Sequence, residues 1–161
     1  VRKAGTILGL KITAVAVHNN EEITALTSHC PEGIDSIFLP RDALIESRID
    51  DFVALSLEKK IILSVTRREM MEKGALFNYG FDGFEMGKQA ARLAEQILKG
   101  ANPGDLPIET AEEYFDLNLK TAVAIGLPIS ERILRLANHV VRPDQEDTGE
   151  ADENPQHATP P

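Results

Sequence analysis

The sequence predicts an α/β fold: a parallel sheet covered by helices on both faces, in a three-layer sandwich. Three observations predict it. Helical and strand-like hydrophobic periods alternate along the first 80 residues. The connections between these periods are short, as they are between neighbouring elements of such a sheet. Residues 60–65 form a largely apolar run, which is typical of a strand buried on both faces.

The first half of the chain supplies three helix–strand pairs. Val and Ile alternate with other residues in the first predicted strand, and proline ends the second. Acidic residues open the second helix, where they favour the positive end of the helix dipole. In chain order we expect the end of a helix at 1–9, a strand at 10–17, a helix at 19–30, a strand at 34–40, a helix at 43–59 and a strand at 60–65.

The second half continues with strands and helices of less regular spacing. A glycine-bounded strand is followed by a long helix with an apolar face, which Gly100 ends. A turn-rich connector follows at 102–107. We expect the strand at 74–80, the long helix at 83–99, a last strand at 113–119, a short helix at 120–125 and a final helix from Ser130 to about His139.

Composition excludes several classes of function. The net charge of −9 argues against nucleic acid as a partner, because nucleic-acid binding needs a basic face. The single cysteine, Cys30, rules out an internal disulfide. No apolar run reaches the roughly 18 residues of a membrane span. Residues 142–161 are rich in carboxylates and proline and lack an apolar period, which predicts a disordered acidic tail.

The sequence carries no catalytic signature. It contains no phosphate-binding loop, no paired-cysteine metal site and no serine elbow. Its four histidines fall in unrelated elements, so they do not predict a metal site. We therefore expect a protein that is not an enzyme, with no catalytic residues, no metal and no cofactor.

Three loops that follow predicted strands are the candidates for ligand binding, because ligands of α/β proteins sit beyond the carboxyl ends of the strands. Each candidate also has a structural alternative. Asp42 is equally suited to cap a helix, Arg67 to form a surface salt bridge, and Phe81 to fill the core. The candidates are Arg41, Asp42, Thr66, Arg67, Tyr79, Phe81 and Asp82. We expect Asp42, Thr66 and Tyr79 to line one crevice.

Several motifs, in order across residues 1–141, resemble one family. The sequence is similar to bacterial ABC-transporter substrate-binding proteins of the tryptophan/tyrosine-binding type, which have the type I periplasmic-binding-protein fold. The motifs are Gly33-Ile-Asp-Ser-Ile-Phe-Leu-Pro-Arg-Asp42, Lys73-Gly-Ala-Leu76, Tyr79-Gly-Phe-Asp82, Gly87-Lys-Gln-Ala90, Ile97-Leu-Lys-Gly100, Leu117-Asn-Leu-Lys-Thr-Ala122 and Ala124-Ile-Gly-Leu127.

This resemblance covers only the C-terminal half of such a protein. It implies that residues 1–72 and 113–141 belong to the second lobe and that 73–112 return to the first lobe. It also implies that Asp42, Thr66 and Tyr79 to Asp82 match binding positions of the family. The family commonly has Thr-Asp-Asn at 41–43 and a small or acidic residue at 67. Arg41 and Arg67 depart from that pattern, which predicts a more anionic ligand than an aromatic amino acid.

The function that the resemblance implies is the solute-binding component of an ABC importer. The ligand is a small molecule, an amino acid or a related compound, held in a cleft between the lobes. The expected partner is a membrane permease, and the expected location is the periplasm, free or anchored as a lipoprotein. The alternative is a ligand-sensing module of a signalling or regulatory protein. We also expect self-association of this chain, because half of the cleft and a sheet edge are exposed.

Overall fold

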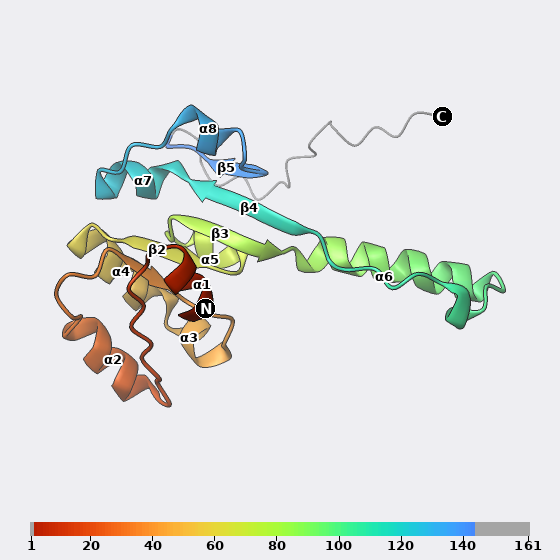
Figure 1. The fold of residues 1–161 in the computed structure, drawn as a ribbon, viewed down its shortest axis with the longest axis horizontal. Coiled ribbons are helices and arrows are strands. Elements are labelled where there is room, and N and C mark those ends of the chain that lie inside the picture. Colours follow the sequence, from red (N-terminus) through yellow and green to blue (C-terminus); the bar gives the residue numbers. More distant parts are fainter. Residues whose placement is uncertain (1, 144–161) are drawn as a thin grey trace.

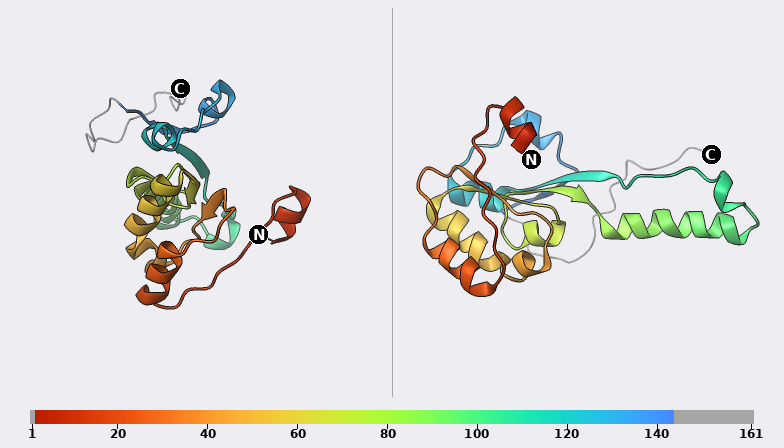
Figure 2. Two further views of the ribbon diagram at one scale, coloured as in Figure 1. Left: turned by 90° about the vertical axis from the view of Figure 1, so that its left-hand side faces the viewer. Right: turned by 60° about the horizontal axis from the view of Figure 1, so that its bottom comes forward.

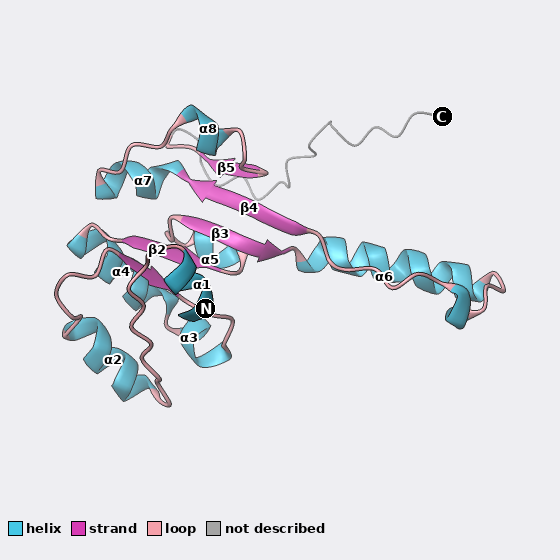
Figure 3. Cartoon of the chain, in the orientation of Figure 1, coloured by secondary structure: helices cyan, strands magenta, loops and turns pink. Residues whose placement is uncertain are grey.

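A five-stranded sheet forms the centre of the molecule in the computed structural model, which describes residues 2–143 (Figures 1 and 3). The spatial order of the strands follows the order in the chain. The strands are β1 (Ser36–Phe38), β2 (Ile62–Val65), β3 (Phe77–Phe81), β4 (Glu113–Asn118) and β5 (His139–Val141). The predicted α/β fold with a mostly parallel sheet is confirmed.

One pair of strands departs from the parallel pattern. β1, β2 and β3 run parallel, β4 runs antiparallel to β3, and β5 runs parallel to β4. β4 reverses direction because the chain leaves the sheet after β3 and comes back at the same edge. The sheet therefore consists of two parallel blocks joined by one antiparallel seam, which hydrophobic periodicity could not reveal.

Hydrophobic clusters cover both faces of this sheet. Successive residues of a strand point to opposite faces, so Leu63 and Ile62 of β2 belong to different clusters. Leu63 packs with residues of α2 (Asn20–Ser28), α4 (Ile49–Lys59) and α5 (Arg68–Glu72). Ile62 packs against the second cluster, with α7 (Leu119–Ile125) and α8 (Glu131–Leu134). We call the sheet with α2–α5, α7 and α8 the sheet body.

The prediction of one helix at 43–59 is wrong, because the structure has two helices there. α3 (Ala43–Ser47) ends at Arg48, and α4 begins at the next residue. The backbone of Arg48 has φ −116° and ψ 22°, outside the helical region, so the hydrogen-bond ladder is interrupted there. α4 ends at Lys60, a non-glycine residue in the left-handed conformation, with φ 55°. The strand predicted from residue 60 therefore begins only at Ile62.

The predicted strand at 10–17 is also wrong. α1 (Arg2–Ile7) is confirmed as a helix that ends near Gly9, but residues 10–17 form an extended connection to α2 without strand pairing. Figure 2 shows α1 held away from the sheet by this connection. The alternating pattern is strand-like, but a strand also needs a neighbour for its backbone hydrogen bonds. None of the described strands pairs with this segment.

The end of the described chain also differs from the prediction. The helix predicted from Ser130 to His139 stops at Leu134, and His139–Val141 join the sheet as β5. Asn138 explains the change of direction: its backbone N–H donates to the Phe115 carbonyl, and its side-chain oxygen accepts from the Phe115 N–H. Most of the predicted acidic tail lies outside the described residues.

α6 (Gly83–Leu98) leaves the sheet body after β3 and projects far beyond it (Figure 1). The chain then turns through the short 3₁₀ helix Pro103–Asp105 and runs back along α6 to β4. No residue of α6 is buried, although its sequence is strongly amphipathic. We call residues 83–112 the α6 arm. No helix among residues 2–143 is both long and apolar enough to cross a membrane.

Candidate functional site

The predicted site residues gather at one edge of the sheet. β1, β2 and β3 are parallel, so their carboxyl ends lie at the same edge, and the antiparallel β4 begins there. Arg41 and Asp42 follow β1, Thr66 and Arg67 follow β2, and Asp82 follows β3. The sequence-based placement of these five residues beyond neighbouring strand ends is therefore correct, whereas Tyr79 and Phe81, which were also expected in a loop, lie within β3.

Arg41 and Asp42 have different surroundings in the loop after β1. The Arg41 guanidinium lies over the ring of Phe81, 5.4 Å from its centroid, which is within the range of a cation–π contact. Asp42 is the N-cap of α3 and accepts hydrogen bonds from Leu44 N (2.9 Å) and Ile45 N (3.2 Å) through one oxygen, Oδ1. Capping and ligand contact remain compatible at Asp42, because the cap uses Oδ1 alone.

Thr66 lies where the loop after β2 touches β3. A Cβ atom added to Gly80 would lie 2.4 Å from the Thr66 carbonyl oxygen, so only glycine permits this approach. The glycine of the Tyr79-Gly80-Phe81-Asp82 motif thus holds the loop after β2 against β3. The role of Gly80 is to allow backbone packing.

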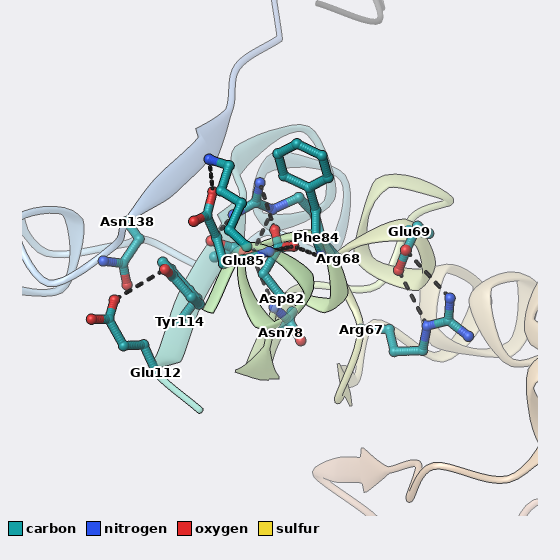
Figure 4. A network of polar contacts seen from close by, with 12 residues as sticks. Arg67, Arg68, Glu69, Asn78, Asp82, Phe84, Glu85, Glu112, Tyr114 and Asn138 are labelled. Atoms are coloured by element: carbon teal, nitrogen blue, oxygen red, sulfur yellow. Dashed lines mark hydrogen bonds and ion pairs between the residues drawn. The ribbon is translucent and has the colours of Figure 1, made fainter. Parts of the chain in front are cut away.

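Arg67 is engaged by two carboxylates. Its Nη1 lies 3.0 Å from Glu46 Oε2 of α3, and its Nε lies 3.3 Å from Glu69 Oε2 of α5 (the second pair is drawn in Figure 4). The hydrogen bond to Glu69, its negative charge and that of Glu46 raise the pKa of Arg67. The salt bridge that was the structural alternative for Arg67 is therefore present, and its charge is compensated. This arrangement does not support the expectation of an anionic ligand.

Tyr79 and Phe81 of β3 lie on the same face of the sheet, and both are substantially exposed. Tyr79 is 54% exposed and Phe81 is 43% exposed, so neither is a core residue. The Tyr79 hydroxyl donates to Glu113 Oε2 at 2.5 Å, and this hydrogen bond raises the pKa of Tyr79. Phe81 is paired with Glu113 across the antiparallel seam. The two rings and Arg41 thus form an open aromatic surface beside Glu113.

Asp82 belongs to a buried polar network (Figure 4). Arg68 donates from Nε and Nη2 to the two carboxylate oxygens of Asp116, at 3.0 and 3.3 Å. Arg68 Nη1 lies 3.6 Å from Asp82 Oδ2. The Asn78 amide donates to Asp116 Oδ2 at 2.9 Å. Asp116 is fully buried, so its charge depends on these donors.

Burial of the guanidinium disfavours the charged form of Arg68, but the carboxylates of Asp116 and Asp82 stabilise that form more strongly. Desolvation lowers the pKa of Arg68, whereas the hydrogen bond to Asp116 and the charges of Asp116 and Asp82 raise it, with a net rise. Arg68 therefore remains a cation that pairs with two carboxylates.

The surface is hollowed in two places near this edge. A small hollow is lined by residues that include Pro40, Glu46 and Thr66. A larger groove of about 320 Å³ runs between the first half of α6 and the segment that leads into β4, with Asp82 and Tyr114 among its lining residues. Neither hollow is lined by Asp42 or Tyr79. The described part of the chain therefore does not by itself form one crevice lined by Asp42, Thr66 and Tyr79.

Sequence reasoning included Asp82 but missed Arg68 and its buried partner Asp116. No local signal marked Asp116, because Phe115 and Leu117 are the apolar positions of the alternation and Asp116 falls on the other, polar face, although the structure buries it. Arg68 could not be chosen over Arg67 from the sequence, because the two are adjacent and only the start of α5 directs them to opposite sides. Among residues 2–143, no group of His, Cys, Asp and Glu could hold a metal ion.

Comparison with known proteins places this architecture in a family. The family model of the ABC transporter substrate binding protein matches residues 2–141. The chain belongs to this family. A curated relative, the tyrosine-binding protein of Clostridioides difficile (strain R20291), is 27% identical over 103 residues. That match covers 64% of this chain and 30% of the relative.

Solved structures of substrate-binding domains share the fold. An ABC domain from Streptococcus pneumonia in complex with L-Trp has a TM-score of 0.72 and 26% identity, over 86% of this chain and 48% of that one. A ligand-free, open substrate-binding protein with adhesive properties from Clostridium difficile has a TM-score of 0.71 and 22% identity, over 87% of this chain and 47% of that one. The chain thus spans about half the length of these two solved structures. It spans less than a third of the length of the curated relative. The resemblance inferred from the sequence is confirmed.

Proposed function

We propose that this chain is the C-terminal part of the solute-binding component of an ABC importer, and that its sheet edge supplies one wall of the ligand cleft. The family match over residues 2–141 carries this proposal. The other wall comes from the part of the protein that the longer relatives have in addition. Ligand capture then requires closure of two lobes about the segments that join them.

The ligand class is an amino acid with an aromatic side chain. One relative is named for tyrosine, and one solved neighbour contains L-Trp. The exposed rings of Tyr79 and Phe81 offer an aromatic surface, and Arg41 beside Phe81 supplies a guanidinium for a ligand carboxylate. Asp42 Oδ2, which the helix cap does not use, suits the ligand ammonium group.

Delivery to a membrane permease and a location in the periplasm, free or as a lipoprotein, complete the proposal. Both agree with the family to which the chain belongs. Neither requires covalent chemistry, and binding by domain closure is sufficient for transport.

Isothermal titration of the full-length protein tests the ligand assignment. L-tyrosine and L-tryptophan are titrated into the wild type and into Arg41→Ala and Asp42→Asn, with succinate as the anionic control. We expect each variant to lose about tenfold or more in affinity, because a charge-assisted hydrogen bond is lost. Asparagine caps a helix as well as aspartate does, so the loss in Asp42→Asn cannot come from a disrupted α3.

Arg48→Ala serves as the matched control. Arg48 pairs with Asp51 of α4 and donates to Thr24 of α2, and it lines neither of the two hollows. It should bind both amino acids like the wild type. Wild-type affinity in Arg41→Ala and Asp42→Asn, or a preference for succinate, would contradict the proposed site.

A further inference from the structure

Two short segments connect the sheet body to the α6 arm. The first joins β3 to α6 through Asp82, and the second leads from the arm into β4 at Glu113. Figure 1 shows both segments at the same end of the sheet body. The direction of the arm relative to the sheet therefore depends on the backbone at these two places. Side chains that bind both sides of a connection restrict its movement.

Arg68 contacts both the sheet body, at Asp116, and the first connection to the arm, at Asp82. It lies in the first turn of α5, on the sheet body. Two of its nitrogens donate to Asp116 in the middle of β4, and the third lies 3.6 Å from Asp82. Asp82 uses Oδ1 to cap α6, accepting from Phe84 N at 2.7 Å and Glu85 N at 3.3 Å, and presents Oδ2 to Arg68.

The geometry requires an arginine. A planar guanidinium can donate to a carboxylate with two nitrogens and keep a third for another partner, whereas the ammonium group of lysine is a single point. Burial fixes Arg68 on the Asp116 side, because the Asp116 side chain is only 1% exposed and also accepts from Asn78. The Asp82 side chain is 23% exposed, so this contact is the weaker and more solvated of the two.

We propose that Arg68 is a positioning residue that sets the direction in which α6 leaves the sheet body, and thereby the balance between open and closed forms of the protein. The inference rests on the proposed function in that α6 belongs to residues 73–112, which return to the first lobe, so that the direction of α6 sets the position of one lobe relative to the other. Arg68 needs no contact with the ligand. It acts by holding the N-cap of α6 against β4 through Asp116.

Distance measurement between the sheet body and the arm tests this role directly. Spin labels are placed on cysteines at Glu58 and Lys99, whose side chains are 71% and 73% exposed, in the full-length protein with Cys30→Ser. Double electron–electron resonance then gives the distribution of distances without ligand. In Arg68→Lys, which keeps the charge beside Asp116, we expect minor orientations to gain roughly fivefold in population.

Arg48→Lys is the matched control, because Arg48 also pairs with an aspartate but lies within the sheet body. It should leave the distance distribution unchanged. A salt bridge that served only stability would lower the melting temperature of Arg68→Lys and leave its distances like those of the wild type. That result would overturn the proposal.

The ligand experiment separates this proposal from the proposed function. In the wild type, no response to L-tryptophan or L-tyrosine contradicts the proposed ligand class, while the label distances still report on Arg68. If L-tryptophan binds, Arg68→Lys is expected to change its affinity about fivefold with Arg41 and Asp42 intact. Unchanged affinity together with unchanged distances would refute the positioning role.

Discussion

The sheet body and the α6 arm are built from equally regular sequence but differ in what covers their apolar side chains. In the sheet body, residues such as Ile49, Leu63 and Leu117 are almost completely buried. In the arm, Met86 and Ile97 of the apolar face of α6 are 40% and 41% exposed, although α6 is the longest helix among the described residues. An amphipathic pattern thus guarantees a helix with an apolar face, but it does not supply the partner that buries that face.

The sheet body and the α6 arm also differ in the burial of their ion pairs. In the sheet body, Arg68 compensates a fully buried carboxylate, Asp116. In the arm, Arg92 pairs with Glu109, and the Arg92 side chain is 52% exposed. A buried pair cannot lose one member without leaving a charge in a poor solvent, whereas water replaces the lost partner of an exposed pair. Arginine–carboxylate pairs therefore contribute to stability very differently in the two regions.

The largest contrast is expected from truncation of a phenylalanine in each region. Phe52→Ala in α4 removes a side chain that is 3% exposed and should lower the free energy of unfolding by about 3–5 kcal/mol, because it leaves a cavity. Phe84→Ala in α6 should lower it by less than about 0.5 kcal/mol. Urea denaturation of the 161-residue chain measures both, and equal losses would break the comparison.

The same two variants in the full-length protein sharpen the result. If the remainder of the protein covers the side of α6 that bears Phe84, Phe84→Ala becomes costly there while Phe52→Ala changes little. A loss at Phe84 that stays below about 0.5 kcal/mol in the full-length protein would show that this side of α6 remains exposed.

A smaller contrast is expected between the two arginines. Arg68→Met should cost about 2–3 kcal/mol, somewhat less than a fully buried pair because the Arg68 side chain is 33% exposed. Arg92→Met should cost about 0–1 kcal/mol. Chemical denaturation at low and high salt distinguishes them, because salt screens the exposed pair and has little effect on the buried one. A strong salt dependence of the Arg68 contribution would contradict its burial.

The smallest effect concerns the two tyrosines, whose pKa values are both raised. The hydrogen bond to Glu113 raises the pKa of Tyr79, and burial followed by the bond to Glu112 raises that of Tyr114. The neutral form is favoured in the folded state, so this contribution to stability is present below about pH 10 and is lost as the pH rises through the folded pKa values. Absorbance of tyrosinate should therefore rise only above pH 10 in the folded chain.

The Glu113→Gln variant shows which part of the tyrosinate titration curve belongs to Tyr79. Removal of the carboxylate should lower the pKa of Tyr79 toward its ordinary value, while Glu112→Gln should move Tyr114 less, because burial is the main cause there. Identical titration curves for the wild type and Glu113→Gln would show that the Tyr79–Glu113 bond does not persist in solution.

Local sequence signals predicted much of the candidate site. Strand ends, caps and the glycine turn placed Arg41, Asp42, Thr66 and Asp82 at one edge of the sheet. Asp42 caps α3, as its position before a helical period suggested, and the structure shows that Asp82 caps α6 as well. A surface salt bridge of Arg67 was an alternative that the sequence offered, but the partners Glu46 of Arg67 and Asp116 of Arg68 could not be predicted, because they are 21 and 48 residues away in the chain.

The sequence by itself determined the α/β class, the positions of most helices and strands, and the family, because hydrophobic periods, capping residues and motifs act over a few neighbouring residues. Only the tertiary structure decided that residues 10–17 form no strand, that 139–141 do, and that β4 runs against β3. Those outcomes depend on which backbone edges meet across the sheet. Pairing between distant segments leaves little trace in a local pattern.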